Sequence, residues 1–220
     1  MDGRRHAFIL HESVIDAIYC LTRPQRSDRR DLLMQGLRKA FSLRVLPELE
    51  VNWFTEPLRE NVFVPGSWTS APGHYAATRA HVLMLEEAWR KNYSCVLILE
   101  DDAHFKDEFY NDFLKLWDDA QEHAPDWLAL FLGYHKRCDL KPVLPNLVVN
   151  KGSTHSHGYI INRHGIWRFL DHLWVRGSAV VDWAYLEIMQ MEDCVYSPPT
   201  PLIGTIESFS DNLGYLVPQT

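Results

Sequence analysis

Apolar and polar residues follow one another along this chain in blocks that predict strands and helices in turn. A mostly apolar run occupies 14–21 (VIDAIYCL), and fully apolar runs occupy 95–99 (CVLIL) and 127–132 (WLALFL). Such runs are typical of strands buried on both faces. Elsewhere apolar residues recur every three or four positions, which predicts amphipathic helices over 31–41, 76–91, 107–123, 165–175 and 182–191. Short strands are expected at 43–46 and 159–161. The pattern predicts an α/β fold with a mostly parallel sheet of the Rossmann type and helices on both faces.

Two segments lack a regular pattern. Residues 48–73 are rich in proline and aromatic residues, and we expect an irregular excursion there. The aromatic rings of 53–68 are candidates for contact with an acceptor molecule, and the alternative for half of them is packing in the core. Residues 196–220 are rich in proline and serine, and we expect them to wrap the surface. No internal repeat is visible, and 220 residues fit a single domain spanning 1–220.

Charge and composition narrow the function. Lys and Arg number 22 against 29 Asp and Glu, so the net charge is −7, which is the wrong sign for a nucleic-acid partner. The four cysteines contain no CxxC pair, so neither a zinc knuckle nor a disulfide scaffold is indicated. No apolar run is long enough for a transmembrane segment, and the first ten residues are unlike a signal peptide. We expect a cytoplasmic protein.

Two charged loops follow predicted strands, and in α/β sheets ligands bind beyond the carboxyl ends of strands. The loop after the first strand carries Arg23, Arg26, Arg29 and Arg30. Guanidinium groups pair well with phosphate, and Arg29 is the preferred candidate. The alternative is that these arginines are solvated or pair with neighbouring aspartates.

The second loop is acidic and follows CVLIL directly. Glu100, Asp101 and Asp102 repel one another unless a positive charge lies among them, and a divalent cation such as Mg²⁺ or Mn²⁺ would supply it. Alternation along an extended chain puts Glu100 and Asp102 on one face and Asp101 on the other. The alternative is a solvated acidic turn that caps the next helix.

Several segments, taken in order, resemble glycosyltransferase family 25, the lipooligosaccharide- and procollagen-galactosyltransferase-like enzymes. Residues 74–105 resemble its helix with Ser-His, apolar strand and Glu-Asp-Asp, and YCLTRPQRSDRR resembles its opening strand and loop. WLALFLGYH, HGYIINRHG, AVVDW and YSPPT…SFSDN match later elements, so the resemblance spans about 14–212. Cys20 replaces the usual Asn, the arginine loop is lengthened, and Ala80 replaces the Ser before His81. These departures leave the donor sugar open.

The resemblance implies a GT-A fold and transfer of a sugar from a UDP-sugar donor to a hydroxyl acceptor with inversion, on an oligosaccharide, a peptide or a small molecule. It implies that the Glu-Asp-Asp is a DxD-type motif that holds the donor diphosphate through Mn²⁺ or Mg²⁺. The metal ligands are then Asp102 and Glu100, and His155 could complete the shell. The predicted donor-binding residues are Thr22, Arg29, His81, Glu100, Asp101, Ser210 and Asp211.

An inverting transfer needs a base for the acceptor hydroxyl. Asp182, at the start of a predicted helix, is the candidate, and the alternative is that it only caps that helix. His155 and His157 lie just ahead of a predicted strand, where they could touch a metal or diphosphate or could simply be solvated.

Two further function classes stay open. A non-catalytic sugar-nucleotide or glycan-binding module would keep the fold and lose the base, although the presence of Glu100, Asp102 and Asp182 speaks against it. A metal-dependent phosphohydrolase would need more carboxylate or histidine ligands at strand ends than the sequence offers.

Overall fold

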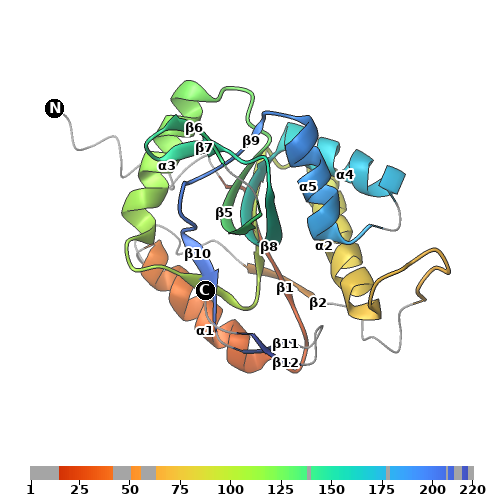
Figure 1. Ribbon diagram of the computed structural model, residues 1–220. Helices are drawn as coiled ribbons and strands as arrows, with labels where there is room; N and C mark the ends of the chain where they lie inside the picture. Colours follow the sequence, from red (N-terminus) through yellow and green to blue (C-terminus); the bar gives the residue numbers. More distant parts are fainter. Residues whose placement is uncertain are drawn as a thin grey trace.

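The computed structural model describes residues 15–41, 51–55, 63–137, 140–176, 179–206, 208–210 and 215–217. Its helices are α1 Ser27–Ala40, α2 Pro72–Arg90, α3 Phe109–His123, α4 Arg163–Arg176 and α5 Val181–Met191. Its strands are β1 Ala17–Thr22, β2 Val51–Thr55, β3 Cys95–Glu100, β4 Ala103–Phe105, β5 Ala129–Lys136, β6 Lys141–Leu144, β7 Leu147–Val149, β8 Ser153–Asn162, β9 Val195–Ser197, β10 Ile203–Thr205, β11 Ser208–Ser210 and β12 Tyr215–Val217. Figure 1 shows a central sheet between two groups of helices.

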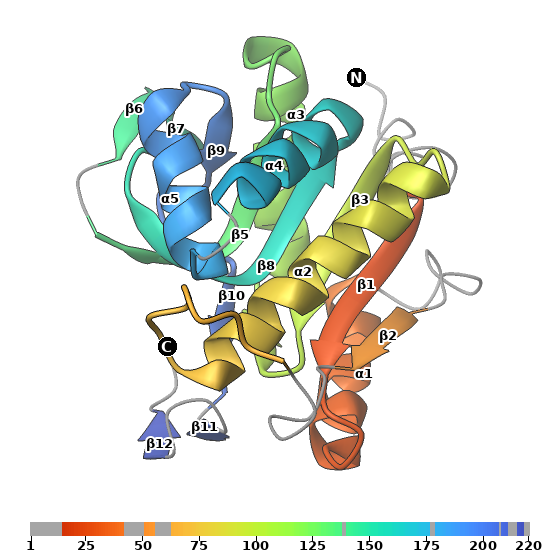
Figure 2. The same cartoon turned by 90° about the vertical axis from the view of Figure 1, so that its right-hand side faces the viewer.

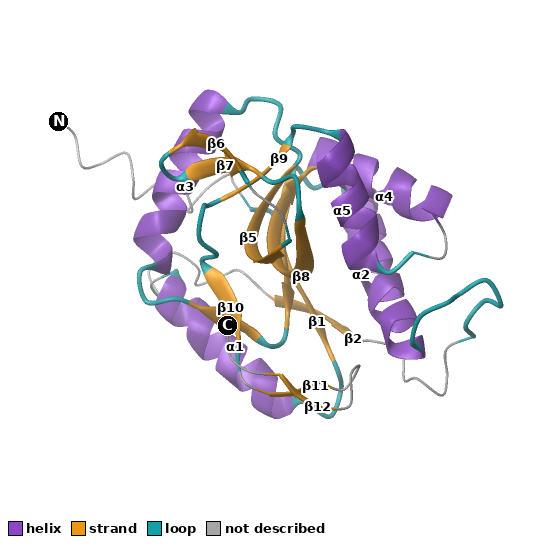
Figure 3. Ribbon diagram, viewed as in Figure 1, coloured by secondary structure: helices purple, strands orange, loops and turns teal. Residues whose placement is uncertain are grey.

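The central sheet has the strand order β2-β1-β3-β8-β5-β9-β7-β6 within the described residues. Strands β2, β1, β3, β5, β9 and β6 run in one direction, and only β8 and β7 run in the other. The expected mostly parallel sheet is therefore confirmed. Because β8 runs antiparallel between β3 and β5, its first residues lie at the same edge as the carboxyl ends of β1, β3 and β5 (Figure 3).

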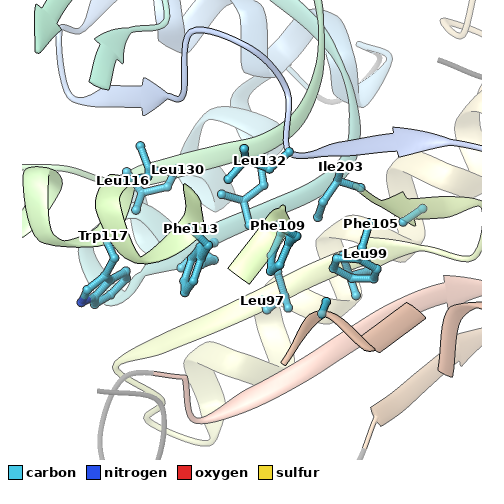
Figure 4. Packing of buried hydrophobic residues seen from close by; sticks show 14 of the residues in the cluster. Leu97, Leu99, Phe105, Phe109, Phe113, Leu116, Trp117, Leu130, Leu132 and Ile203 are labelled. Atoms are coloured by element: carbon cyan, nitrogen blue, oxygen red, sulfur yellow. The ribbon is translucent and has the colours of Figure 1, made fainter. Parts of the chain in front are cut away.

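Helices cover both faces of this sheet, as expected from strands that are apolar throughout. On one face α1 and α3 pack over β3 and β5, and Figure 4 shows side chains of β3, β4, α3, β5 and β10 meeting in one cluster. On the other face α2, α4 and α5 lie side by side (Figure 2). Phe131 and Tyr159 stack there with ring centroids 5.0 Å apart. Burial of each such side chain contributes about 1.5 to 3 kcal/mol.

The five predicted helices are all present, and the apolar runs form β1, β3 and β5. The irregular excursion predicted over 48–73 is wrong at β2, which pairs in parallel with β1 from Ile18 opposite Val51 to Thr22 opposite Thr55. The backbone edge of β1 supplies the hydrogen bonds, so this strand forms without an apolar run of its own. The strand predicted at 43–46 lies outside the described residues.

The predicted surface tail is also wrong in part. Strand β9 joins the central sheet, and Ile203 of β10 is fully buried. Strands of three or four residues carry too little alternation to be recognised, which is why the sequence does not predict β4, β6 and β7 either. No helix in the described part of the chain is both long enough and apolar enough to cross a lipid bilayer.

Candidate functional site

The acidic triplet lies where β3 leaves the sheet. Glu100 is the last residue of β3, and Asp101 and Asp102 form the turn that leads into β4. The end of β1, the start of α1, the first half of β8 and the start of α5 surround this turn through the contacts below. The three carboxylates have different partners, and these define the site.

Asp101 is held by two neighbours on the α1 side of the sheet. Its Oδ2 accepts a hydrogen bond from Thr22 Oγ1 at 2.7 Å, and its Oδ1 accepts one from Arg29 Nη1 at 2.8 Å. The side chains of Arg29 and Asp101 are only 9% and 8% exposed, so this is a buried ion pair. Three predicted donor-binding residues thus contact one another and tie β1 and α1 to the acidic turn. Direct contact of these residues with a donor stays a prediction.

Other arginines of the basic loop are engaged within the protein. Arg26 pairs with Asp28 at 3.1 Å, and Arg30 donates a hydrogen bond to the Arg23 carbonyl at 2.9 Å. The Arg30 guanidinium also lies over the ring of Trp53, 5.6 Å from its centroid. For Arg26 the alternative of pairing with a neighbouring aspartate is the observed arrangement.

Glu100 faces the opposite side of the sheet from Asp101, as alternation predicts. Its Oε1 accepts a hydrogen bond from Ser156 Oγ at 3.2 Å and lies 3.7 Å from His81 Nε2 of α2. His81 is fully buried, and its Nδ1 lies 3.0 Å from the Tyr159 hydroxyl, which in turn contacts the Tyr185 hydroxyl at 3.0 Å. His81 is therefore positioned by the core and reaches Glu100.

Asp182 lies in the first turn of α5, and its Oδ1 accepts a hydrogen bond from Ser156 Oγ at 3.0 Å. The N-cap position of α5 is Val180, which makes no side-chain cap. The backbone N–H of Val181 donates instead to Thr78 Oγ1 of α2, at 3.0 Å. Asp182 is thus turned toward Ser156 and Glu100. Capping the start of α5 was the alternative role for Asp182, and there Thr78 accepts the hydrogen bond of one of the N–H groups that the first turn leaves free.

A bulge in β8 brings Ser156 to this position. Gly133 pairs with Gly158 and His135 with Thr154, so two steps along β5 face four steps along β8. His155, within the bulge, has a φ of 69°, in the left-handed region that non-glycine residues rarely adopt. We call 155–157 the β8 bulge. The prediction that His155 and His157 precede the strand is wrong, because β8 begins at Ser153.

The two bulge histidines differ in their surroundings. His157 is buried, its Nε2 contacts the Ile203 carbonyl at 3.2 Å, and its Nδ1 has no hydrogen-bond partner. Burial lowers the pKa of His157 to about 4, so its ring is neutral at pH 7. Gly133 packs against this ring so closely that a Cβ there would lie 2.4 Å from it.

The His155 ring packs against the His135 ring at a tilt of 36°, with centroids 5.4 Å apart. Burial lowers the pKa of His155, and the negative charge of Asp182 opposes that shift. Within the described residues, no group of three or more His, Cys, Asp or Glu side chains is arranged to hold a metal ion. The predicted shell of Asp102, Glu100 and His155 is therefore not assembled, because the bulge directs His155 toward His135 and Asp182.

Asp102 is the carboxylate of the three with a buried oxygen that accepts no hydrogen bond within the described residues. Its Oδ1 is buried and makes no hydrogen bond, although the residue as a whole is partly exposed. Burial, and next the charge of Glu100, raise the pKa of Asp102 to about 7. A carboxylate oxygen in this condition is suited to a cation, and Mg²⁺ commonly binds through one or two carboxylates together with substrate phosphates. Asp102 and Glu100 fit such a group.

Two predicted residues lie at the limit of what is described. Ser210 is the last residue of β11, which pairs with β12, and its side chain lies outside the described set together with Asp211. The sequence reasoning missed Ser156 and Thr78. The polar run STHSHG at the start of an apolar strand is the signal that pointed to this region, although it did not single out the serine.

Comparison with known proteins gives weak similarity to one kind of enzyme. No family model matches the chain. It is 25% identical over 166 residues to procollagen galactosyltransferase 2 of Homo sapiens, and 23% identical over 178 residues to that of Mus musculus. Each match covers 68% of this chain and 26% of the relative, so the chain spans about a quarter of the length of these proteins.

Solved structures resemble the chain only loosely. A197 from STIV gives a TM-score of 0.47 with 12% identity, covering 93% of each chain. An apo UDP-glucose pyrophosphorylase gives 0.45 with 7% identity, covering 84% of this chain and 74% of the other. Similarity at this level supports no inference about function.

Proposed function

We propose that this chain is the catalytic domain of a metal-dependent, inverting glycosyltransferase that moves a sugar from a UDP-sugar to a hydroxyl acceptor. The observation that carries the proposal is that one serine hydroxyl bridges Glu100 and Asp182, directly beside the turn in which Asp102 has a buried oxygen that accepts no hydrogen bond. The weak similarity to procollagen galactosyltransferase 2 supports the choice of glycosyl transfer.

Asp102 and Glu100 would hold the cation beside the donor diphosphate. A cation bound there would offset the negative charge that builds on the diphosphate as the glycosidic bond breaks. The Oδ1 of Asp102 accepts no hydrogen bond, and burial together with the charge of Glu100 outweighs the opposing charge of Arg29 and raises the pKa of Asp102. A cation bound there would stabilise the charged form, which supports this role. His81 of α2 lies 3.7 Å from the Glu100 carboxylate and limits its position. The Arg29–Asp101 pair fixes the turn that carries Asp102.

Asp182 would accept the proton of the acceptor hydroxyl while the oxygen of that hydroxyl attacks the anomeric carbon of the donor sugar. The oxygen of the acceptor forms the new glycosidic bond, the bond to the diphosphate breaks, and the proton stays on the Asp182 carboxylate until it passes to solvent. General base catalysis of this kind contributes about a hundredfold to ten-thousandfold in rate. The hydrogen bond from Ser156 supports this role, because it fixes the direction of the Asp182 carboxylate.

The test follows UDP release with Mn²⁺, a panel of UDP-sugars, and acceptors that include oligosaccharides, hydroxylated peptides and small alcohols. We expect release that depends on an acceptor. Asp102→Asn should remove manganese-linked donor binding, whereas Asp182→Asn should keep donor binding and lower turnover about a hundredfold or more. Asp171→Asn, on the exposed side of α4, is the matched control and should change neither quantity.

Each alternative class has its own outcome in this assay. Donor binding without release by the unaltered chain would point to a binding module. Release of phosphate from simple phosphoesters would point to a hydrolase. An Asp182→Asn variant with unaltered turnover would exclude Asp182 as the base.

A further inference from the structure

We propose that Ser156 is a positioning residue that holds the base Asp182 in register with Glu100, and that the β8 bulge serves to place it there. The inference rests on the proposed function, since it needs Asp182 to act as a base. Ser156 belongs to none of the predicted metal, donor or base residues.

The contacts of Ser156 are those of a bridge. Its side chain is buried at 2% exposure, and its one oxygen lies 3.0 Å from Asp182 Oδ1 and 3.2 Å from Glu100 Oε1. Within the described residues it is the only hydrogen-bond partner of the Asp182 carboxylate, whereas Glu100 also lies 3.7 Å from His81 Nε2. A hydroxyl carries one proton, so Ser156 can donate fully to only one carboxylate at a time. Loss of the hydroxyl should therefore release Asp182 much more than Glu100.

The backbone shows that this placement is maintained at a cost. A regular strand would put Ser156 and Tyr159, three residues apart, on opposite faces. The irregular register at the β8 bulge instead leaves both on the side of His81 and Glu100. The left-handed φ of His155 is strained and persists only because the flanks are fixed. On one side Arg137 Nε donates to Thr154 Oγ1 at 3.0 Å, and on the other His157 contacts the Ile203 carbonyl. Bulges that redirect a side chain in this way are common beside active sites.

The consequence is that different residues should determine donor affinity and the rate of transfer. Donor affinity should depend on Asp102 and Glu100, which keep their positions without Ser156. The rate of transfer should depend on the direction of Asp182, and a misplacement of about 1 Å can cost about a hundredfold. Ser156 should therefore affect kcat and leave the KM for the donor nearly unchanged.

The test uses a pair of substitutions with the same shape, Ser156→Thr and Ser156→Val, which differ only in the hydroxyl. We expect Ser156→Val to lower kcat tenfold to a hundredfold relative to Ser156→Thr, with donor KM within about threefold. In an Asp182→Asn background the two should have equal rates, because the residue acts through Asp182. Ser153→Ala, which removes another buried hydroxyl of β8, is the control and should keep kcat.

Equal kcat for Ser156→Thr and Ser156→Val would overturn the proposal, and so would a tenfold difference that persists in the Asp182→Asn background. A second readout does not require activity: crystal structures of the two variants should show the Asp182 carboxylate in place with Thr and displaced with Val. An unmoved carboxylate in Ser156→Val overturns the positioning role. Absence of transfer by the unaltered chain would instead overturn the proposed function.

Discussion

Asp101 and Asp102 are neighbours in one turn, yet they lie in opposite kinds of surroundings. Both oxygens of Asp101 accept hydrogen bonds, from Thr22 and Arg29, whereas a buried oxygen of Asp102 accepts none. The first carboxylate is neutralised within the fold and stabilises it. The second has a buried oxygen that accepts no hydrogen bond, and burial disfavours its charged form, which costs stability. The comparison teaches that position in a motif does not decide the role of a carboxylate; its partners do.

The largest expected effect concerns the neutralised member of the pair. Arg29→Met removes the partner of a buried carboxylate, and we expect the free energy of unfolding to fall by about 3 to 5 kcal/mol in urea titrations. The double variant Arg29→Met with Asp101→Leu should recover most of that loss, because no uncompensated charge is then buried. A loss below about 1 kcal/mol in the single variant would mean that Asp101 is not dependent on Arg29.

A smaller effect of opposite sign is expected at Asp102. Asp102→Asn replaces an unpartnered carboxylate with a neutral amide and should raise the free energy of unfolding by about 2 kcal/mol at pH 8. The folded-state pKa is raised to about 7 from an ordinary value near 3.8, so the penalty of this carboxylate grows as pH rises between those values. The stability gain should accordingly be least near pH 4 and level off above pH 7.

Urea titrations of Asp102→Asn across that pH range would measure the profile, and Asp171→Asn on the exposed side of α4 is the control. A loss of stability at pH 8 would show that Asp102 has a favourable partner in the folded protein, and the contrast with Asp101 would then fail.

The smallest expected effect is at the β8 bulge. His155→Gly relieves the left-handed backbone, and after the entropy cost of glycine we expect a gain of about 1 kcal/mol in the free energy of unfolding. His135→Gly, at the residue whose ring packs against His155, should instead lose stability, since its backbone needs no glycine. Thermal unfolding of both variants measures the difference, and destabilisation by His155→Gly would indicate that the bulge carries no strain.

The long helices and the central strands are predicted well from the sequence, because the spacing of their apolar residues shows which side chains are buried. Helix α3 shows this, since Phe109, Phe113 and Leu116 repeat on one face and all are buried. Strand β2 could not be found this way, because its five residues are only partly buried and it forms by pairing with β1. Backbone pairing between distant segments leaves little trace in a local pattern.

For the site, alternation correctly separated Glu100 from Asp101, and the partners of the two confirm it. The pairing of Arg29 with Asp101 joins residues 72 positions apart and could not be derived from either segment alone. Ser156 was missed because a bulge is a difference in register between two strands, and one strand read alone does not contain it. The roles of Asp182 and Asp102 stay predictions until the variants are measured.

Helix α2 carries both Thr78, which anchors the start of α5, and His81, which reaches Glu100. One helix thus contacts both Glu100 and the start of the helix that carries Asp182. A thermal displacement of α2 would move the carboxylates of Glu100 and Asp182 together and keep the distance between them nearly constant. In an in-line displacement the base and the leaving group must stay aligned with each other. Motion that moves Asp182 and Glu100 together preserves this alignment, whereas independent motion of the two would disturb it.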